Sequence, residues 1–374
     1  MVGPIQSIPA RPIAGSISDY YGYYWFDDLP PNVAVIQDIH HAYAMKISEF
    51  FEDSLTQDNS YRSFVRNRGR TKVFQGTCFR NSHIFDYDNR ISYADDFDLV
   101  LIMSYEMTYN WLGPPVSSLG IDWFYEGLKN CLSVYMPFRN KFRTGDYFQA
   151  TINTLCTRYY TNPHIALPHL QLVNLAETDD YAKDLLSSRA WAFAVSTDIR
   201  TRWMMQGKMM RPVEDLAIRP LVMKRARGEA YGIEEWMEFL KPIMGDEIQE
   251  RYKDMLAGKI ILLDPRLFGA KTHYLKQVDM EFLDFGMERK SFDLGMITGL
   301  KKGSRAEKAG LRDGDTIISN SYVWKCEACL EERMDVVIER DGVVETIRYW
   351  PRSYTKAEGW QMVKREEKKD VPVQ

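Results

Sequence analysis

Cysteine and histidine are scarce in this sequence of 374 residues, which contains five of the first and six of the second. An odd, low number of cysteines argues against a disulfide framework and favours a reducing, cytoplasmic environment. No stretch approaches the roughly 18 apolar residues that a membrane span needs, and the amino terminus lacks the apolar run of a secretory signal. The net charge is only −4, and there is no glycine-rich phosphate loop. We therefore expect no nucleic acid, membrane or cofactor as a partner.

What the chain does have is apolar and aromatic side chains, at 45% and 13% of its residues. This content is enough for a large core and more than one domain. Apolar residues recur at helical spacing up to about residue 257, interrupted by an alternating, strand-like stretch at 71–88. Short strand-like runs with glycine turns follow, including a hairpin signal at Asp341-Gly342. The pattern predicts an α+β protein with an N-terminal arm or first edge strand at 1–30, a mainly helical domain at 31–265, a β domain at 276–352 and a tail at 353–374.

The C-terminal region contains the stretch GSRAEKAGLRDGD at 303–315, which resembles the signature of PDZ domains. Ala306 and Ala309 are small enough to pack a helix tightly on a sheet, and Gly310 suits the left-handed conformation that ends a helix. Upstream, LDFGM at 283–287 resembles the loop whose backbone amides receive a peptide carboxylate. A peptide or protein C-terminus is the partner that this implies, and a purely structural PDZ-like domain is the alternative. The residues implied in peptide binding are Phe285, Gly286 and Met287.

The central region carries its most specific pattern in DLVLIMSYEMTYNWLGPP at 98–115. Tyr105, Glu106 and Tyr109 stand where an HExxH helix has two zinc-binding histidines and the glutamate that activates water. Glu126 follows seventeen residues after Tyr109, within DWFYEGL. With FQGTCFRNSHIF, YYTNPH and the PDZ-like signature, these motifs resemble the glycyl-aminopeptidase-type gluzincin metallopeptidases over about 60–350. The resemblance implies a gluzincin, thermolysin-like fold, with Glu106 matching the general base and Glu126 the third metal ligand.

The departures from that family change the expected chemistry. Two phenols, each with a pKa of about 10, and one carboxylate make a poor site for zinc, which prefers nitrogen and sulfur ligands, so we expect no metal. A family tyrosine that supports the oxyanion is also missing, because LSSRAW leaves only Ser187 and Arg189 in that place. Among the six histidines, His83 lies on the strand expected to flank the cleft.

Three interpretations remain open. In the first, the fold is repurposed for metal-independent isomerisation, dehydration, aldol-type or cyclisation chemistry on a small carbonyl compound. Glu106 is then the base, Tyr105 and Tyr109 donate hydrogen bonds to the carbonyl oxygen, and Glu126 is the partner acid. The second is a non-catalytic pseudopeptidase that acts as a peptide binder or scaffold, and the third is a metallopeptidase with unusual ligands. An open, aromatic-lined pocket at Glu106 favours catalysis, and a volume filled by side chains favours a scaffold. The residues expected to contact substrate are Gly76, Thr77, His83, Trp111, Trp123, Tyr125, Tyr160, Ser187 and Arg189.

Overall fold

The computed structural model describes residues 5–8, 20–26, 28–56, 58–69, 73–113, 122–209, 211–229, 231–264 and 273–365. These residues form a mixed α and β structure, as the sequence pattern predicts. The chain divides into two compact units, residues 1–151 with 204–249 and residues 152–203 with 250–374. The helical region 31–265, expected as one domain, contributes to both units. Helical periodicity shows that a helix buries one face, but it does not show which neighbour covers that face. Three helices run from one unit into the other: α5 (Gly145–Tyr160), α7 (Asp180–Met204) and α10 (Glu247–Leu256).

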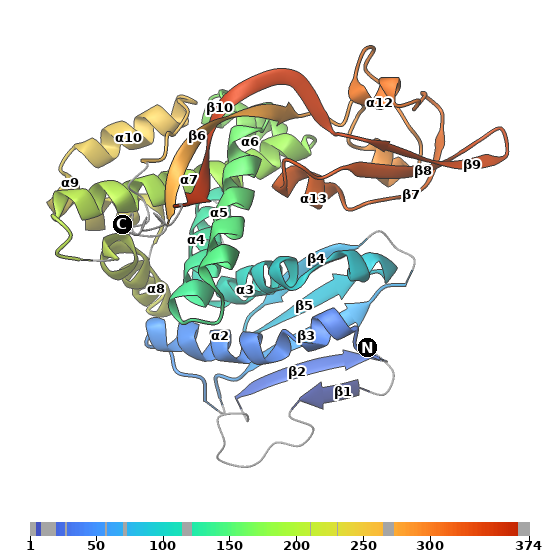
Figure 1. The fold of residues 1–374 in the computed structure, drawn as a ribbon. Coiled ribbons are helices and arrows are strands. Elements are labelled where there is room, and N and C mark those ends of the chain that lie inside the picture. Colours follow the sequence, from blue (N-terminus) through green and yellow to red (C-terminus); the bar gives the residue numbers. More distant parts are fainter. Residues whose placement is uncertain are drawn as a thin grey trace, which may run out of the picture. The chain divides into compact units, whose positions relative to one another are not determined.

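The first unit is built on a five-stranded sheet in the order β1-β2-β3-β5-β4 (Figure 1). Its strands are β1 (Ile5–Ile8), β2 (Tyr21–Phe26), β3 (Tyr61–Asn67), β4 (Phe74–Phe79) and β5 (Ser82–Tyr87). The three inner strands run parallel, whereas β1 and β4 are antiparallel edge strands. The alternating stretch at 71–88 predicts strands, and its described part contains β4 and β5. Residues 1–30, expected as an arm or a first edge strand, contribute two strands within their described part, one of them at the edge of the sheet.

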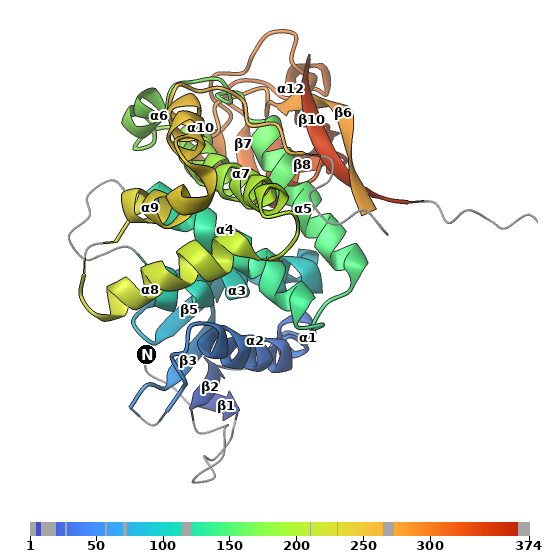
Figure 2. The same ribbon diagram turned by 90° about the vertical axis from the view of Figure 1, so that its left-hand side faces the viewer.

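The helices of the first unit pack on this sheet and on one another. α2 (Gln37–Phe50) and α3 (Asp96–Leu112) contact the sheet and each other, and α4 (Asp122–Arg139) lies against α3 (Figure 2). A hydrogen bond of 2.6 Å between the Tyr43 hydroxyl and Oγ1 of Thr108 ties α2 to α3 inside this core. The shorter helical elements are α1 (Pro31–Ala34), the 3₁₀ turn η2 (Asn89–Tyr93), the π-helical turn η3 (Glu214–Ile218), α8 (Arg219–Ala226) and α9 (Ile233–Met244).

The second unit combines a long strand pair with a small sheet (Figure 1). β6 (His273–Leu283) and β10 (Arg352–Lys364) pair antiparallel, and β7 (Thr316–Asn320), β8 (Met334–Arg340) and β9 (Val343–Tyr349) form a three-stranded antiparallel sheet. Residues 352–364 are therefore a strand, although 353–374 is expected as a tail, because the partner strand lies too far along the chain for a local pattern to show the pairing. The helices that lie wholly in this unit are α6 (His169–Leu175), α11 (Ser291–Leu294), α12 (Arg305–Lys308) and α13 (Val323–Ala328).

The glycine turns of the second unit have the backbone conformations that the sequence predicts. Asp341 and Gly342 connect β8 to β9 with φ angles of +52° and +77°, which is the requirement of a two-residue hairpin turn. Gly310 follows α12 with a φ angle of +109°, where a side chain would be strained. Within the described ranges, no helix combines the length and the apolar content that crossing a membrane requires.

Candidate functional site

Helix α3 carries Tyr105, Glu106 and Tyr109 beside a buried, mainly apolar face. The Asp95 carboxylate starts the helix by accepting a hydrogen bond from the Asp98 amide, and the Asp98 carboxylate accepts one from the Asp95 amide, which completes a capping box. Burial of the apolar face fixes the rotation of the helix, and the three site residues remain partly exposed. The buried apolar residues of α3 include Leu99, Val100, Met103 and Met107.

The carboxylate of Glu106 lies against strand β4. Its side chain packs so closely on Gly76 that a Cβ atom there would come within 2.2 Å of Cγ and Cδ of Glu106. Cys78, on the same face of the strand, donates its S–H to Oε2 of Glu106 at 2.5 Å. Burial raises the pKa of the Glu106 carboxyl, and the Cys78 hydrogen bond and the charge of Lys129 oppose only part of that rise. Burial also raises the pKa of the Cys78 thiol, so the thiol acts here as a donor.

A buried lysine supplies the positive charge at this site. Lys129 lies on α4, and its Nζ atom is 2.6 Å from Oε1 of Glu126. The same atom lies over two phenol rings, 4.3 Å from the centre of Tyr105 and 4.8 Å from the centre of Tyr109, within the range of cation–π attraction. Only 3% of the Lys129 side chain is exposed, against 26% for Glu126. The ammonium group is therefore held by two rings and a carboxylate, next to Glu106.

The packing of α3 on α4 and β4 gathers the four residues expected at the catalytic centre and adds two that the sequence analysis missed. Lys129 is one of them, and its spacing of three from Glu126 on a helix was the available signal. Cys78 is the other, and its spacing of two from Gly76 on a strand placed it on the same face. The sequence does not show that Lys129 and Cys78 come together at one site, because they lie on different elements.

The donor atoms at this site do not fit a zinc ion. The positions that match the family's histidines carry phenol rings that lie against an ammonium group, and Glu126 is already paired with the same group. A divalent cation placed between these side chains would be repelled by Lys129 at short range. In the part of the chain that the structure describes, no cluster of three or more His, Cys, Asp or Glu side chains is arranged to hold a metal.

Strands β4 and β5 carry three further residues expected at the site, Gly76, Thr77 and His83, and these have different surroundings. His83 is fully buried, with Nδ1 3.1 Å from the Tyr61 hydroxyl, and burial lowers its pKa to about 3, so the imidazole is neutral. Thr77 is exposed and points away from the face that Gly76 presents to Glu106. Of these residues, Gly76 alone touches Glu106 through a close approach.

The aromatic residues expected to line a pocket in the first unit are packed instead. Trp111 donates from Nε1 to Oδ2 of Asp53 at 2.9 Å, and Tyr125 donates to the carbonyl of Tyr231 at 2.9 Å. Trp123 is buried as well. These contacts are structural, and they leave the partly exposed phenols of α3 as the aromatic surface beside Glu106.

Tyr160, Ser187 and Arg189 belong to the second unit, where two of them hold loops. The Tyr160 hydroxyl donates to the carbonyl of Ile261 at 3.0 Å. Arg189 is 1% exposed and donates from Nη2 to the carbonyls of Ile165 and Leu167, each at 2.8 Å. Ser187 lies on α7, partly exposed.

The residues implied in peptide binding also lie in the second unit. Phe285 and Met287 are buried in its apolar core. Gly286 has a φ angle of +72°, its amide donates to Oδ1 of Asp284, and a Cβ atom there would come within 2.8 Å of Ala306 Cβ. The loop therefore packs tightly on the segment that carries the PDZ-like signature.

Comparison with known proteins finds no matching family model and no matching curated protein. Among solved structures, an aminopeptidase N family protein from Idiomarina loihiensis is similar, with a TM-score of 0.61 and 14% identity over 92% of this chain and 67% of that one. An M1 zinc metallopeptidase from Deinococcus radiodurans, bound to a Tyr-Ser-Ala substrate, gives a TM-score of 0.43 and 12% identity. That comparison covers 66% of this chain and half of the other. The first likeness shows the fold, which this chain shares with that aminopeptidase N family protein.

Proposed function

We propose that this protein is a metal-independent acid/base catalyst for a small carbonyl-containing molecule, with Glu106 as the group that moves protons. The observation that carries the proposal is the Lys129 ammonium, which lies over the rings of Tyr105 and Tyr109 beside the Glu106 carboxyl. It supplies, without a metal, the positive charge that stabilises a developing oxyanion in metal-dependent enzymes. Because the fold is shared with zinc aminopeptidases while the ligand set is not, we place the chemistry outside peptide hydrolysis.

The residues support one proton-transfer sequence. Ionised Glu106 takes a proton from the carbon next to the carbonyl, and the C–H electron pair becomes the C=C bond of an enolate. The enolate oxygen receives the negative charge, which Lys129 and a phenol O–H of Tyr105 or Tyr109 stabilise. In an α-hydroxy ketone, the α-hydroxyl proton moves to the enolate oxygen and Glu106 returns its proton to the former carbonyl carbon, which completes an isomerisation. In a β-hydroxy ketone, the enolate electrons re-form the C=O bond, the Cα=Cβ bond forms as the C–O bond to the β-hydroxyl breaks, and Glu106 protonates the leaving hydroxide, which completes a dehydration. No oxidant or second substrate is needed.

The surroundings of Glu106 suit this role. Burial raises the pKa of its carboxyl, which makes the carboxylate a stronger base than one in water. The Cys78 hydrogen bond and the charge of Lys129 act in the opposite direction and offset part of that rise in pKa. Glu126 pairs with Lys129 through Oε1 and positions the ammonium; the ion pair makes it a positioning group in place of the partner acid that the sequence predicts.

The test is exchange of carbon-bound protons. Cyclohexanone, an aryl ketone and an α-hydroxy ketone are incubated with the protein in D₂O, and loss of the α-proton signals is followed by NMR. Glu106→Gln should slow any catalysed exchange by on the order of 10²–10⁴-fold with the fold retained. Glu238→Gln, an exposed glutamate on α9 of the same unit, is the control and should leave the rate unchanged. Equal exchange by the wild-type protein and Glu106→Gln would contradict the assignment.

A second candidate function is that of a non-catalytic pseudopeptidase that binds peptides. It is favoured by the filled site, because Trp111, Trp123 and Tyr125, expected to line an open pocket, are buried and packed instead. Lys129 and Glu126 neutralise each other, and the Lys129 ammonium lies over the rings of Tyr105 and Tyr109. Such an ion pair can also stabilise a site that no longer catalyses a reaction. The PDZ-like loop around Gly286 would then be the working surface. Fluorescence anisotropy with a library of labelled C-terminal peptides tests this: binding that is lost in Gly286→Val, together with no catalysed exchange in any ketone, selects the second function.

A further inference from the structure

The candidate site contains a nucleophile that the proposed proton transfer does not use. Cys78 is partly exposed on β4, and its S–H group donates to Oε2 of Glu106 at 2.5 Å. A thiol within hydrogen-bond reach of a base is the arrangement that activates a nucleophile in covalent catalysis. The charge of Lys129 acts on the same thiol, since it opposes the rise in the pKa of Cys78. A nucleophile, a base and an ammonium group therefore meet at one place.

Two hydrogen-bond donors at this place are available to a ligand. The hydroxyl groups of Tyr105 and Tyr109 make no hydrogen bond with any residue that the structure describes, and both residues are partly exposed. The centres of their rings lie 4.3 and 4.8 Å from Nζ of Lys129. A ligand oxygen that accepts hydrogen bonds from a phenol and from the ammonium group would satisfy these donors. The arrangement points to a carbonyl oxygen held near the sulfur of Cys78.

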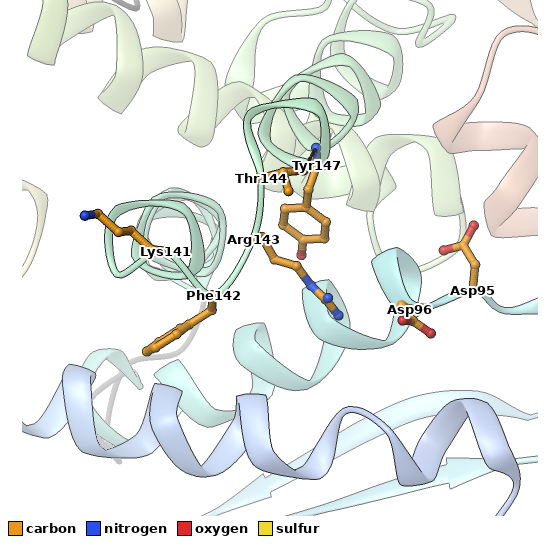
Figure 3. A pocket seen from close by; sticks show the side chains of 7 residues that line it. All are labelled: Asp95, Asp96, Lys141, Phe142, Arg143, Thr144 and Tyr147. Carbon is orange, nitrogen blue, oxygen red and sulfur yellow. Dashed lines mark hydrogen bonds between the residues drawn. The ribbon is translucent and has the colours of Figure 1, made fainter.

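This site is distinct from the cavity of about 530 Å³ at the N-terminal end of α3, which Figure 3 shows. Asp96, at the edge of that cavity, is ten residues before Glu106 on the helix, which is roughly 15 Å along the axis at 1.5 Å per residue. No thiol is among the side chains that line it, which are Asp95, Asp96, Lys141, Phe142, Arg143, Thr144 and Tyr147. A compound bound in that cavity therefore leaves no mark on a cysteine.

We propose that Cys78 adds covalently to small α,β-unsaturated carbonyl compounds, with Glu106 accepting the thiol proton. The carbonyl oxygen of the compound meets Lys129 and a phenol hydroxyl, and its β-carbon meets the sulfur. The addition goes beyond the proton transfer proposed above, because sulfur forms a bond to carbon and the product stays attached to the protein. The dehydration described above yields a compound of this class, so the two reactions share one kind of ligand.

The atoms and electrons of the addition balance without a further reactant. Glu106 takes the S–H proton as the sulfur forms a bond to the β-carbon. The Cα=Cβ electron pair becomes the C=C bond of an enolate, and the C=O electron pair moves to the oxygen, where Lys129 and a phenol O–H stabilise the charge. Glu106 then gives the proton to the α-carbon and the C=O bond re-forms. The product is a thioether at Cys78.

The charges of the site favour this route over attack by a free thiolate. Burial and the negative charge of Glu106 raise the pKa of the Cys78 thiol, because a thiolate would stand beside a carboxylate. Transfer of the proton during formation of the C–S bond avoids that repulsion, since Glu106 becomes neutral while the charge moves to an oxygen near Lys129. The site should therefore select electrophiles that carry a carbonyl oxygen.

The experiment measures adduct formation at each cysteine of the full chain. The protein is incubated with 2-cyclohexenone near neutral pH and digested, and the modified fraction of each cysteine is followed over time by mass spectrometry. Allyl bromide, which alkylates thiols but has no carbonyl oxygen, is the comparison reagent. Three buried cysteines report whether a sample is unfolded, because they become modified only then: Cys131, Cys156 and Cys326.

Cys329 is the reference thiol within the same chain. It is exposed, and its S–H group donates to Oε2 of Glu331 at 3.4 Å, so it also has a carboxylate beside it but lies in the second unit. We expect 2-cyclohexenone to modify Cys78 at least about tenfold faster than Cys329. Allyl bromide should favour Cys329, which is the more exposed thiol.

The variants separate the base from the groups that hold the carbonyl oxygen. Glu106→Gln should slow the addition of 2-cyclohexenone to Cys78 at least about tenfold and leave Cys329 unchanged. Lys129→Met should also slow it, whereas Lys141→Met, the same change at the cavity in Figure 3, should not. Replacement of both Tyr105 and Tyr109 by phenylalanine keeps the rings and removes the hydroxyls, so it should slow 2-cyclohexenone but not allyl bromide.

Three results would each overturn the inference: modification of Cys78 no faster than Cys329, an unchanged rate in folded Glu106→Gln, or an equal preference of allyl bromide for Cys78. If Glu106→Gln unfolds, the double tyrosine variant decides. Exchange of α-protons without an adduct would refute this inference alone, and an adduct without exchange would refute the proposed proton transfer alone.

Discussion

Replacement of Lys129 by methionine tests most directly how the altered site is held together. The side chain is 3% exposed, so its charge is compensated almost entirely by protein groups. Methionine keeps the length and apolar stem but removes the ammonium, its 2.6 Å pair with Glu126 and its contacts with the rings of Tyr105 and Tyr109. We expect a large loss of stability in the first unit, and an asymmetry between the two partners of the pair.

The magnitude follows from which charge is left behind. Breaking a buried pair costs about 3–5 kcal/mol, mostly because the remaining charge has no partner. After Lys129→Met the remaining group is Glu126, which is 26% exposed and is rehydrated in part, so we expect about 2–3 kcal/mol. After Glu126→Gln the remaining group is a buried ammonium, so we expect about 3–5 kcal/mol. The double variant should cost less than the sum of the two, because it leaves neither charge unpaired.

Urea unfolding followed by circular dichroism measures these free energies from the unfolding transition of the first unit. Lys46 and Glu49 provide the matched control, since they form a pair at the same spacing and the same 2.6 Å distance but are 44% and 56% exposed. Lys46→Met and Glu49→Gln should each cost under about 1 kcal/mol. The reasoning is refuted if Lys129→Met costs no more than Lys46→Met, or if the Lys129 and Glu126 effects simply add.

Three further predictions follow from single positions. Catalysed exchange should rise with pH through the raised pKa of Glu106, because ionised Glu106 is the base. The raised pKa also contributes stability that is present below the ordinary pKa of a glutamate and is lost as the pH rises through the higher pKa of the folded state, so Glu106→Gln should flatten that loss in pH-dependent unfolding. Gly76→Ala should displace the Glu106 carboxylate and reduce exchange at least tenfold with little change in melting temperature, because the new Cβ meets a movable side chain at 2.2 Å. Gly286→Ala should destabilise the second unit by about 1–3 kcal/mol in urea unfolding, and more than Gly303→Ala, since both have positive φ but only the first meets neighbouring atoms.

Local patterns in the sequence were sufficient for several parts of this protein. The capping residues and apolar spacing of α3, the alternation in the β4–β5 hairpin and the turn at Asp341-Gly342 all follow from interactions within a few residues. The tyrosines at 105 and 109 also lead us to expect no zinc on chemical grounds alone, because a phenol is a poor ligand near neutral pH.

The pairing of distant segments was decided by the tertiary structure. β10 pairs with β6, and the region expected as one helical domain contributes to two units, because these outcomes depend on which buried faces meet. The same reason explains the site: Lys129 on α4 and Cys78 on β4 become partners of Glu106 only when both elements pack on α3. The sequence by itself determined that one helix carries Tyr105, Glu106 and Tyr109, and that tyrosine stands at the two positions where the resembled family has histidine. Tertiary packing decided that a buried ammonium holds the positive charge there, because an electrostatic contact depends on distance in space and not on separation along the chain.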